Sequence, residues 1–448
     1  MKDNSASGIK KKLRSLLMAA AVVLVCMLLV GGLSLFGVVK PAVQQPETRD
    51  IPGDLSHKGY TLEKVVVLSR HNIRSPLSGN DSVLGRITPH EWYQWSSPAS
   101  QLSVRGGTLE TCMGQYFRKW LEKEDLFTEN YRPDEETVRI YANSKQRTIA
   151  TAEFFSAGLM PTANEDVAYH VEFDEMDPVF TPQITYISDE YKKAATEQIE
   201  EMYSDDIQSL GDNYELVSDV IDMEDSEAWK DGTVTEFKTD DTKVILEEGK
   251  EPAMEGSLKT ACSVSDAMVL QYYEDKDAKE AAFGNDLSDK DWEDISEIKD
   301  VYVDTLFSAP LIATNVAHPL LQEIQSEMDE EDREFTFLCG HDSNVASVLA
   351  ALGAEEYELP CTIEKRTPIG CKLVFSKWES ADGKDYWSAD LVYQTTEQLR
   401  GMELLDEENH PAIYPVSLKG VKKNDDGLYT EEAFEKRLDD AIKEYDRL

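Results

Sequence analysis

Three polar segments of the chain carry side chains that can bind phosphate and transfer a phosphoryl group. They are Arg70-His71-Asn72-Ile73-Arg74-Ser75-Pro76, Asn143-Ser144-Lys145-Gln146-Arg147-Thr148 and Gly340-His341-Asp342-Ser343-Asn344. The guanidinium of an arginine is a rigid fork of donors that matches the oxygens of a phosphate. Three such groups in one place repel one another unless an anion lies between them. Arg70, Arg74 and Arg147 therefore predict a site for a phosphate dianion.

The same segments supply a nucleophile and a proton donor. A neutral imidazole at His71 can attack phosphorus while the arginines stabilise charge on the equatorial oxygens, and water can then resolve the labile phosphohistidine. Asp342 is the expected general acid, which protonates the leaving oxygen and then helps to activate water. The charge of a bound phosphate raises the pKa of a nearby carboxyl, so Asp342 is expected to be protonated at mildly acid pH. This chemistry requires no metal and no cofactor.

Each motif also has a structural explanation when it is taken alone. An Arg-His pair commonly lies on the surface, and a His-Asp pair after a strand can serve as a helix cap. The chain combines R-H-x-x-R-x-P after one apolar run with G-H-D about 270 residues later. A helix that begins at the second motif would add backbone N–H groups and the positive end of its dipole. We interpret the combination as a catalytic site.

Apolar runs before these segments predict the strands that position them. Residues 63–68, 138–141 and 335–338 are short runs typical of strands that are covered on both faces. Residues 109–121 and 345–352 instead place apolar side chains three or four positions apart, as amphipathic helices do. The alternation predicts an α/β fold with a mostly parallel sheet and flanking helices. Ligands bind such sheets at the carboxyl ends of the strands, so we expect the polar segments to meet in one crevice.

The pattern changes in the middle of the chain. Residues 165–300 are rich in acidic residues, with helical patterns and no comparable strand runs. We expect residues 60–164 and 301–448 to form the α/β core. Residues 165–300 are then a mainly helical insertion on the substrate side of that core.

The N-terminal region has the pattern of a membrane anchor. Residues 1–14 carry five basic residues and one acid, and residues 15–39 are 25 residues without a charge. That length can span a hydrocarbon core of about 30 Å, and the basic flank favours a cytoplasmic N-terminus. We expect a single-pass signal-anchor, a tether at 40–59 and a catalytic domain on the extracytoplasmic side. A cleaved signal peptide, which would release the domain, is the alternative.

Composition limits the partners of the protein. The chain has 45 Lys+Arg against 87 Asp+Glu, a formal net charge of −42. Nucleic acid is excluded as a partner because its phosphate backbone requires a basic surface. A small anion requires a local positive pocket within this acidic envelope. Five of the six cysteines follow the predicted span, and their spacing indicates neither a disulfide scaffold nor a structural metal site.

Beyond the two motifs, several longer segments carry a family resemblance. They are Tyr141-Ala142-Asn143-Ser144-Lys145-Gln146-Arg147-Thr148, Met176-Asp177-Pro178, Leu270-Gln271-Tyr272-Tyr273-Glu274 and Arg366-Thr367-Pro368-Ile369-Gly370. From about Tyr60 to its end, the chain resembles the histidine acid phosphatases, branch two of the histidine phosphatase superfamily. Within that family it is most similar to the bacterial glucose-1-phosphatases, which are related to the periplasmic phytases.

The resemblance implies a role for each residue of the site. It implies a phosphoglycerate-mutase-like core in which His71 is the phosphorylated nucleophile and Asp342 the proton donor. Arg70, Arg74, Arg147 and His341 match the phosphate-binding residues of the family. Glu251 aligns with a glutamate that contacts sugar in glucose-1-phosphatases, although it can also be read as a surface residue. Asn72 replaces the usual glycine of the family, as it does in glucose-1-phosphatases, and asparagine tolerates left-handed backbone geometry.

The resemblance implies an acid phosphomonoesterase that hydrolyses sugar phosphates of the glucose 1-phosphate type. The alternative within the family is a phytase, which acts on myo-inositol hexakisphosphate. The acidic envelope disfavours such a highly charged substrate. An inactive phosphate-binding receptor is the alternative of another class, but it would be expected to have lost His71 or Asp342. The expected partners are thus a small phosphomonoester and, through the anchor, a membrane, while the sequence carries no signal for an oligomeric state.

Overall fold

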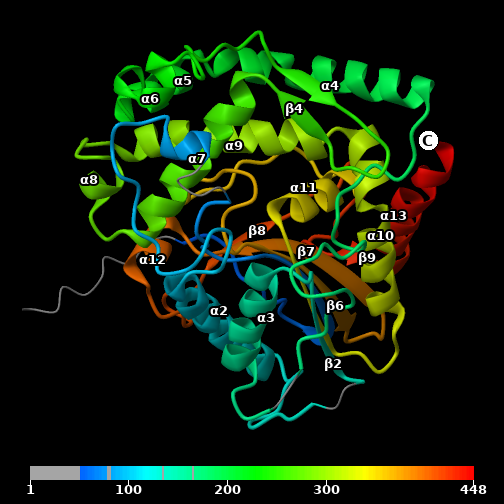
Figure 1. Cartoon of the computed structure of the whole chain (residues 1–448). Coiled ribbons are helices and arrows are strands. Elements are labelled where there is room, and N and C mark those ends of the chain that lie inside the picture. Colours follow the sequence, from blue (N-terminus) through cyan, green and yellow to red (C-terminus); the bar gives the residue numbers. More distant parts are fainter. Residues whose placement is uncertain (1–50, 78–81, 134–135, 164–165) are drawn as a thin grey trace, which may run out of the picture. The chain divides into compact units, whose positions relative to one another are not determined.

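A central mixed β-sheet carries the three polar segments (Figure 1). The computed structural model describes residues 51–448 except 78–81, 134–135 and 164–165. Within these residues the strand order is β2-β5-β1-β6-β7-β8, with β9 beside β7. The strands are β1 (Tyr60–Arg70), β2 (Val138–Ala142), β5 (Phe335–Gly340), β6 (Lys372–Ser380), β7 (Asp385–Tyr393), β8 (Ala412–Pro415) and β9 (Tyr429–Thr430).

The three predicted strands are confirmed as β1, β2 and β5, and they are neighbours. Both β1 and β2 pair in parallel with β5. In this register Arg70 lies opposite Gly340, and Ala142 lies opposite Cys339. The three polar segments therefore leave the same edge of the sheet within one residue of one another.

The prediction of a mostly parallel sheet is wrong. Strand β6 pairs antiparallel with β1, β7 with β6, and β8 and β9 with β7. The chain turns back on itself between β6 and β7, where Gly383 has a φ of +73° and the Ser380 N–H donates to the Lys384 carbonyl at 2.9 Å. An Asp-Gly pair between two apolar runs is a hairpin signal, and Asp382-Gly383 carries it. That hairpin makes β7 run antiparallel to β6.

Helices cover both faces of the sheet, as the apolar runs predicted. Val65 and Val67 of β1 pack in the cluster formed with α2 (Val104–Lys123) and α3 (Gln146–Leu159). Val66 and Leu68 point to the other face, where the cluster includes α10 (Pro310–Asp329), α11 (Asp342–Ala351) and α13 (Glu431–Glu444). All four β1 side chains are fully buried. Figure 1 shows α2 and α3 on one side of the sheet and α10 and α13 on the other.

Two glycines allow α2 and α3 to cross closely. A Cβ atom on Gly114 would lie 2.2 Å from the carbonyl oxygen of Phe155, and one on Gly158 would lie 2.2 Å from that of Thr111. Larger residues would push the helices apart. The close crossing matters for the site because the first turn of α3 carries Arg147.

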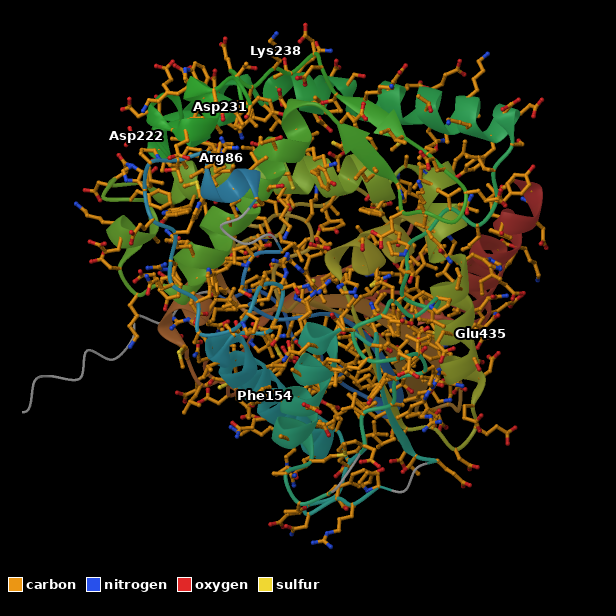
Figure 2. The ribbon with its side chains drawn as sticks, in the orientation of Figure 1. Arg86, Phe154, Asp222, Asp231, Lys238 and Glu435 are labelled. Carbon is orange, nitrogen blue, oxygen red and sulfur yellow. The ribbon has the colours of Figure 1, made fainter. Side chains whose placement is uncertain are left out.

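Residues 189–307 form a helical region that supplies most of the side chains of one hydrophobic cluster. Its helices are α4 (Asp189–Ser209), α5 (Gly211–Val220), α6 (Glu227–Lys230), α7 (Ser257–Glu274), α8 (Ala278–Ala281) and α9 (Asp289–Phe307). It also contains a short antiparallel pair, β3 (Lys243–Ile245) and β4 (Ala253–Glu255), which the sequence analysis missed. Arg86 follows the short 3-10 helix η1 (Val83–Gly85) and forms an ion pair with Asp231 after α6 (Figure 2). The proposed domain boundaries stay a prediction.

The predicted cytoplasmic segment and membrane span, residues 1–14 and 15–39, lie outside the described residues. In the part of the chain that the structure describes, no helix combines the length and apolar character needed to cross a bilayer.

Candidate active site

The predicted site residues meet around one cavity of about 320 Å³. Six of the seven line it, and they are His71, Arg74, Arg147, Glu251, His341 and Asp342. The seventh, Arg70, is 1% exposed and reaches the same place, with its Nη2 3.5 Å from Oδ2 of Asp342. Other lining residues come from the helical region and include Asp266 of α7 and Lys299 of α9.

The geometry of His71 leaves one ring nitrogen free to attack. The backbone N–H of His71 donates to the carbonyl of Gly340 at 3.0 Å, which extends the pairing of β1 with β5 by one residue. Nδ1 lies 2.9 Å from the carbonyl oxygen of Asn72. A carbonyl can only accept, so Nδ1 carries the proton and Nε2 keeps its lone pair. Burial, reinforced by the charge of Arg147, holds the pKa of His71 well below its ordinary value. The imidazole is therefore neutral, as a nucleophile must be.

Asn72 is held by a buried ion pair. Its Nδ2 donates to Oε2 of Glu110 at 2.8 Å, and its Oδ1 accepts from the N–H of Ile73 at 2.8 Å. Glu110 pairs with Lys372 at 2.8 Å, and both side chains are 0% exposed. Asn72 is not among the residues with a positive φ, so the left-handed geometry considered for it is wrong. Its side chain anchors the loop whose carbonyl orients His71.

Two of the three arginines already have carboxylate partners. Nη1 of Arg70 donates to Oε1 of Glu364 at 2.7 Å, and Nη2 of Arg74 donates to Oδ2 of Asp266 at 3.0 Å. These carboxylates relieve the repulsion that the sequence analysis expected a phosphate to relieve. Arg147 has no ion pair within 4 Å among the described residues. Burial and the nearby Arg74 lower the pKa of Arg147 to about 10, so this guanidinium has the most to gain from a bound phosphate.

His341 lies beside His71, and its ring is oriented by Asn143, the residue that follows β2. Its ring centroid is 5.5 Å from that of His71. Its Nε2 lies 2.7 Å from Nδ2 of Asn143, whose Oδ1 accepts from the N–H of Asp177 at 2.9 Å. Burial, together with the charge of Arg147, lowers the pKa of His341 well below its ordinary value. A neutral His341 can donate one hydrogen bond to phosphate without adding charge.

Asp342 is the first residue of α11, and its two oxygens have different surroundings. Oδ1 accepts from the N–H of Ser343 at 2.9 Å. Oδ2 lies 3.2 Å from Nζ of Lys299 and 3.5 Å from Nη2 of Arg70. Burial raises the pKa of Asp342, but Lys299 and Arg70 outweigh it and hold the pKa well below 3.8. The carboxyl is thus ionised beside these two cations, and a bound phosphate must offset them before Asp342 can hold the expected proton.

Glu251 lies on the wall of the cavity just before β4. Its side chain is exposed. The position is compatible with the sugar contact that the resemblance implies, and its role stays a prediction.

Sequence reasoning missed the charged residues that brace the site. They are Glu110, Asp266, Lys299, Glu364 and Lys372, each 14% exposed or less. Charged side chains are rarely buried unless they are paired. Asp266 and Lys299 both occupy positions within the apolar pattern of their helices, and that placement was the available signal. The sequence could not reveal which partners they pair with.

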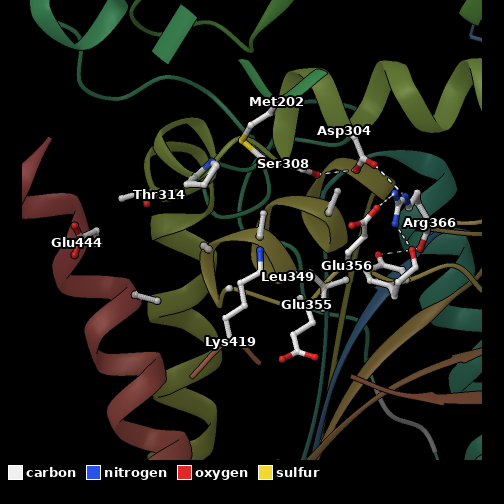
Figure 3. A pocket seen from close by; sticks show the side chains of 18 of the residues that line it. Met202, Asp304, Ser308, Thr314, Leu349, Glu355, Glu356, Arg366, Lys419 and Glu444 are labelled. Atoms are coloured by element: carbon white, nitrogen blue, oxygen red, sulfur yellow. Dashed lines mark hydrogen bonds and ion pairs between the residues drawn. The ribbon is translucent and has the colours of Figure 1, made fainter. Parts of the chain in front are cut away.

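A second cavity, of about 600 Å³, lies towards the C-terminal end of α11 (Figure 3). Leu349 faces it from α11, and Arg366 pairs with Asp304 at 3.2 Å on its wall. None of the seven predicted site residues lines it. We therefore select the candidate active site by its chemistry and not by the size of its cavity.

Comparison with known proteins places this arrangement in a family. The family model of the histidine phosphatase superfamily (branch 2) matches residues 61–389. A glucose-1-phosphatase of Providencia rettgeri is 37% identical over 389 residues, which is 86% of this chain and 92% of that protein. A second, from Salmonella typhimurium, is 36% identical over 391 residues, 86% of this chain and 94% of the relative.

Solved structures agree with this assignment. The phytase of Hafnia alvei in complex with myo-inositol hexakis sulphate has a TM-score of 0.77 at 26% identity, covering 87% of this chain and 99% of its own. Sequence and fold agree, and the chain belongs to branch 2 of the histidine phosphatase superfamily.

Proposed function

We propose that this protein is an acid phosphomonoesterase that hydrolyses sugar phosphates of the glucose 1-phosphate type through a phosphohistidine at His71. One observation carries the proposal: the unprotonated Nε2 of His71 shares a cavity with the unpaired guanidinium of Arg147 and the carboxyl of Asp342. A nucleophile, a free cation and a proton carrier are the groups that phosphoryl transfer requires. The two glucose-1-phosphatases, at 36–37% identity, support the same reaction.

The reaction takes place in two steps. Nε2 of His71 attacks phosphorus, the bond from phosphorus to the leaving oxygen breaks, and Oδ2 of Asp342 gives its proton to that oxygen. Water then attacks phosphorus, the nitrogen–phosphorus bond breaks with its electrons returning to Nε2, and Asp342 takes the proton from water. Arg70, Arg74, Arg147 and His341 hold the phosphoryl oxygens in both steps.

The charge of the cavity favours a monophosphate over a hexakisphosphate. Four cationic side chains line it, Arg74, Arg147, Lys259 and Lys299, against the three carboxylates of Glu251, Asp266 and Asp342. Arg74 and Lys299 are already paired with Asp266. The remaining positive charge suits one phosphate group. The runner-up substrate, phytate, is supported by the similarity to a phytase of Escherichia coli at 24% identity.

We further propose that residues 15–39 anchor the protein to a membrane with the catalytic domain on the extracytoplasmic side. The support is the uncharged stretch and the basic residues before it. In cell fractionation the phosphatase activity should sediment with membranes and stay there after washing at high salt. Activity recovered only in the soluble fraction would contradict the anchor.

Phosphate release from three substrates tests the substrate choice. At about pH 5, kcat/KM for glucose 1-phosphate should exceed that for myo-inositol hexakisphosphate by roughly 10-fold or more, because the cavity lacks cations for additional phosphates. A higher value for phytate would replace the first proposal with the second. No release from either compound or from p-nitrophenyl phosphate would support the receptor alternative and refute the enzyme.

The nucleophile can be identified by trapping. His71→Ala should lower turnover by about 10³-fold or more and abolish acid-labile labelling of the protein by a 32P-labelled substrate. Arg147→Gln is the matched control, since it weakens phosphate binding but leaves the nucleophile in place and should still be labelled. Labelling that persists in the His71→Ala protein would assign the nucleophile elsewhere.

The proton donor can be identified by the leaving group. Asp342→Asn should lower kcat for a sugar phosphate by about 10²–10⁴-fold, because a sugar alkoxide cannot leave without a proton. Loss on p-nitrophenyl phosphate should be much smaller, since p-nitrophenolate leaves unaided. Equal losses on both substrates would mean that Asp342 only supports the structure.

A further inference from the structure

Lys299 lies between two carboxylates at the back of the cavity. Its Nζ is 2.7 Å from Oδ1 of Asp266 and 3.2 Å from Oδ2 of Asp342. The side chain is 7% exposed, yet it lines the cavity. Desolvating an ammonium is costly unless it is paired. Two carboxylate partners at these distances keep Lys299 protonated, and its pKa is raised in spite of burial and the nearby Arg70.

Asp266 fixes the position of Lys299. Its Oδ1 accepts from Lys299 while its Oδ2 accepts from Nη2 of Arg74 at 3.0 Å. Asp266 therefore ties α9 to the loop after β1, and it holds the ammonium of Lys299 at a place 3.2 Å from Oδ2 of Asp342. Lys299 is the nearer of the two cations that contact Asp342 among the described residues.

The contact falls on the oxygen that must exchange the proton. Oδ1 of Asp342 is occupied by the N–H of Ser343, so Oδ2 is the oxygen available to carry a proton. The other groups around Asp342 come from several elements. They are Arg70 at the end of β1, His71 just after it, Arg147 on α3, His341 before α11, Cys262 and Asp266 on α7, Tyr302 on α9, and Glu251 before β4. Among the described residues, the charged groups in contact with Oδ2 are Arg70 from this set and Lys299.

We propose that Lys299, braced by Asp266, is a positioning residue that orients Oδ2 of Asp342 and determines the pH range in which this oxygen can carry the proton for the leaving group. The inference rests on the proposed function, because it concerns the donor of that reaction. When Asp342 gives up its proton, Lys299 stabilises the carboxylate that forms. The same cation limits the pH up to which Asp342 keeps the proton.

Removing the charge of Lys299 should shift the pH profile of phosphatase activity in a defined direction. A nearby cation lowers the pKa of a carboxyl, so removing it raises that pKa. In Lys299→Met, the alkaline limb of kcat for glucose 1-phosphate, which reports the enzyme–substrate complex, should move to higher pH by roughly 1 unit. Its kcat at acid pH should fall by more for glucose 1-phosphate than for p-nitrophenyl phosphate, because the carboxyl becomes a weaker acid. Lys299→Arg should restore the wild-type limb.

Two further variants isolate the effect. Lys259→Met removes the same charge from an exposed lysine of the same cavity and should leave the limb in place. In the Asp342→Asn protein, adding Lys299→Met should produce no further shift of the alkaline limb of the pH profile. If the Met variant melts at a lower temperature or does not fold, Lys299→Gln keeps a hydrogen-bond donor for Asp266 without the charge and should give the same shift.

The outcomes separate this inference from the proposed function. A wild-type protein without phosphatase activity refutes the function itself. An active wild type with an unmoved limb in folded Lys299→Met refutes the role of Lys299, and so does a rise in KM for both substrates without a shift, which would make Lys299 a direct substrate contact. A shift of the same size in the absence of Asp342 would also overturn the inference.

Discussion

The parallel register of β2, β5 and β1 is the constraint on which the site depends. Backbone pairing places Arg70 opposite Gly340 and Ala142 opposite Cys339, and hydrogen bonds continue the pattern past the strands. The His71 N–H donates to Gly340 at 3.0 Å, and the Asn143 N–H donates to Cys339 at 2.9 Å. A slip of one residue in any strand would turn its side chains to the other face of the sheet. The first residues of the site are thus positioned by main-chain bonds.

Charge pairing provides the second level of order. Three buried cations at the site each have a carboxylate partner: Arg70 pairs with Glu364, Arg74 with Asp266, and Lys299 with Asp342. A fourth pair, Lys372 with Glu110, holds the side chain of Asn72. Breaking a buried pair by removing one partner costs about 3–5 kcal/mol. Such a network is stiff, and of the three arginines of the site it leaves Arg147 without a carboxylate partner among the described residues. A protein with a net charge of −42 can bind phosphate because the relevant field is that of this enclosed site.

Local pattern explains which strands were predicted and which were missed. Strands β1, β2 and β5 are covered on both faces, so they read as continuous apolar runs, which are easily found. Strands β6 and β7 mix polar and apolar residues, and the Asp382-Gly383 turn between them was the signal for a hairpin. Asn72 shows a different failure. Residue type suggested a role for its backbone, whereas its side chain proved to bind Glu110.

The sequence by itself determined the chemistry of the site, because arginine, histidine and aspartate at the ends of apolar runs have few other uses in such a combination. It identified His71, Asp342, Arg70, Arg74, Arg147, His341 and Glu251, and the cavity brings them together. Only the tertiary structure decided the protonation states. They depend on distances of about 3 Å between residues of different elements, such as Lys299 on α9 and Asp342 on α11, or Arg74 after β1 and Asp266 on α7. Electrostatic interaction depends on distance and burial, and residue order along the chain contains neither quantity.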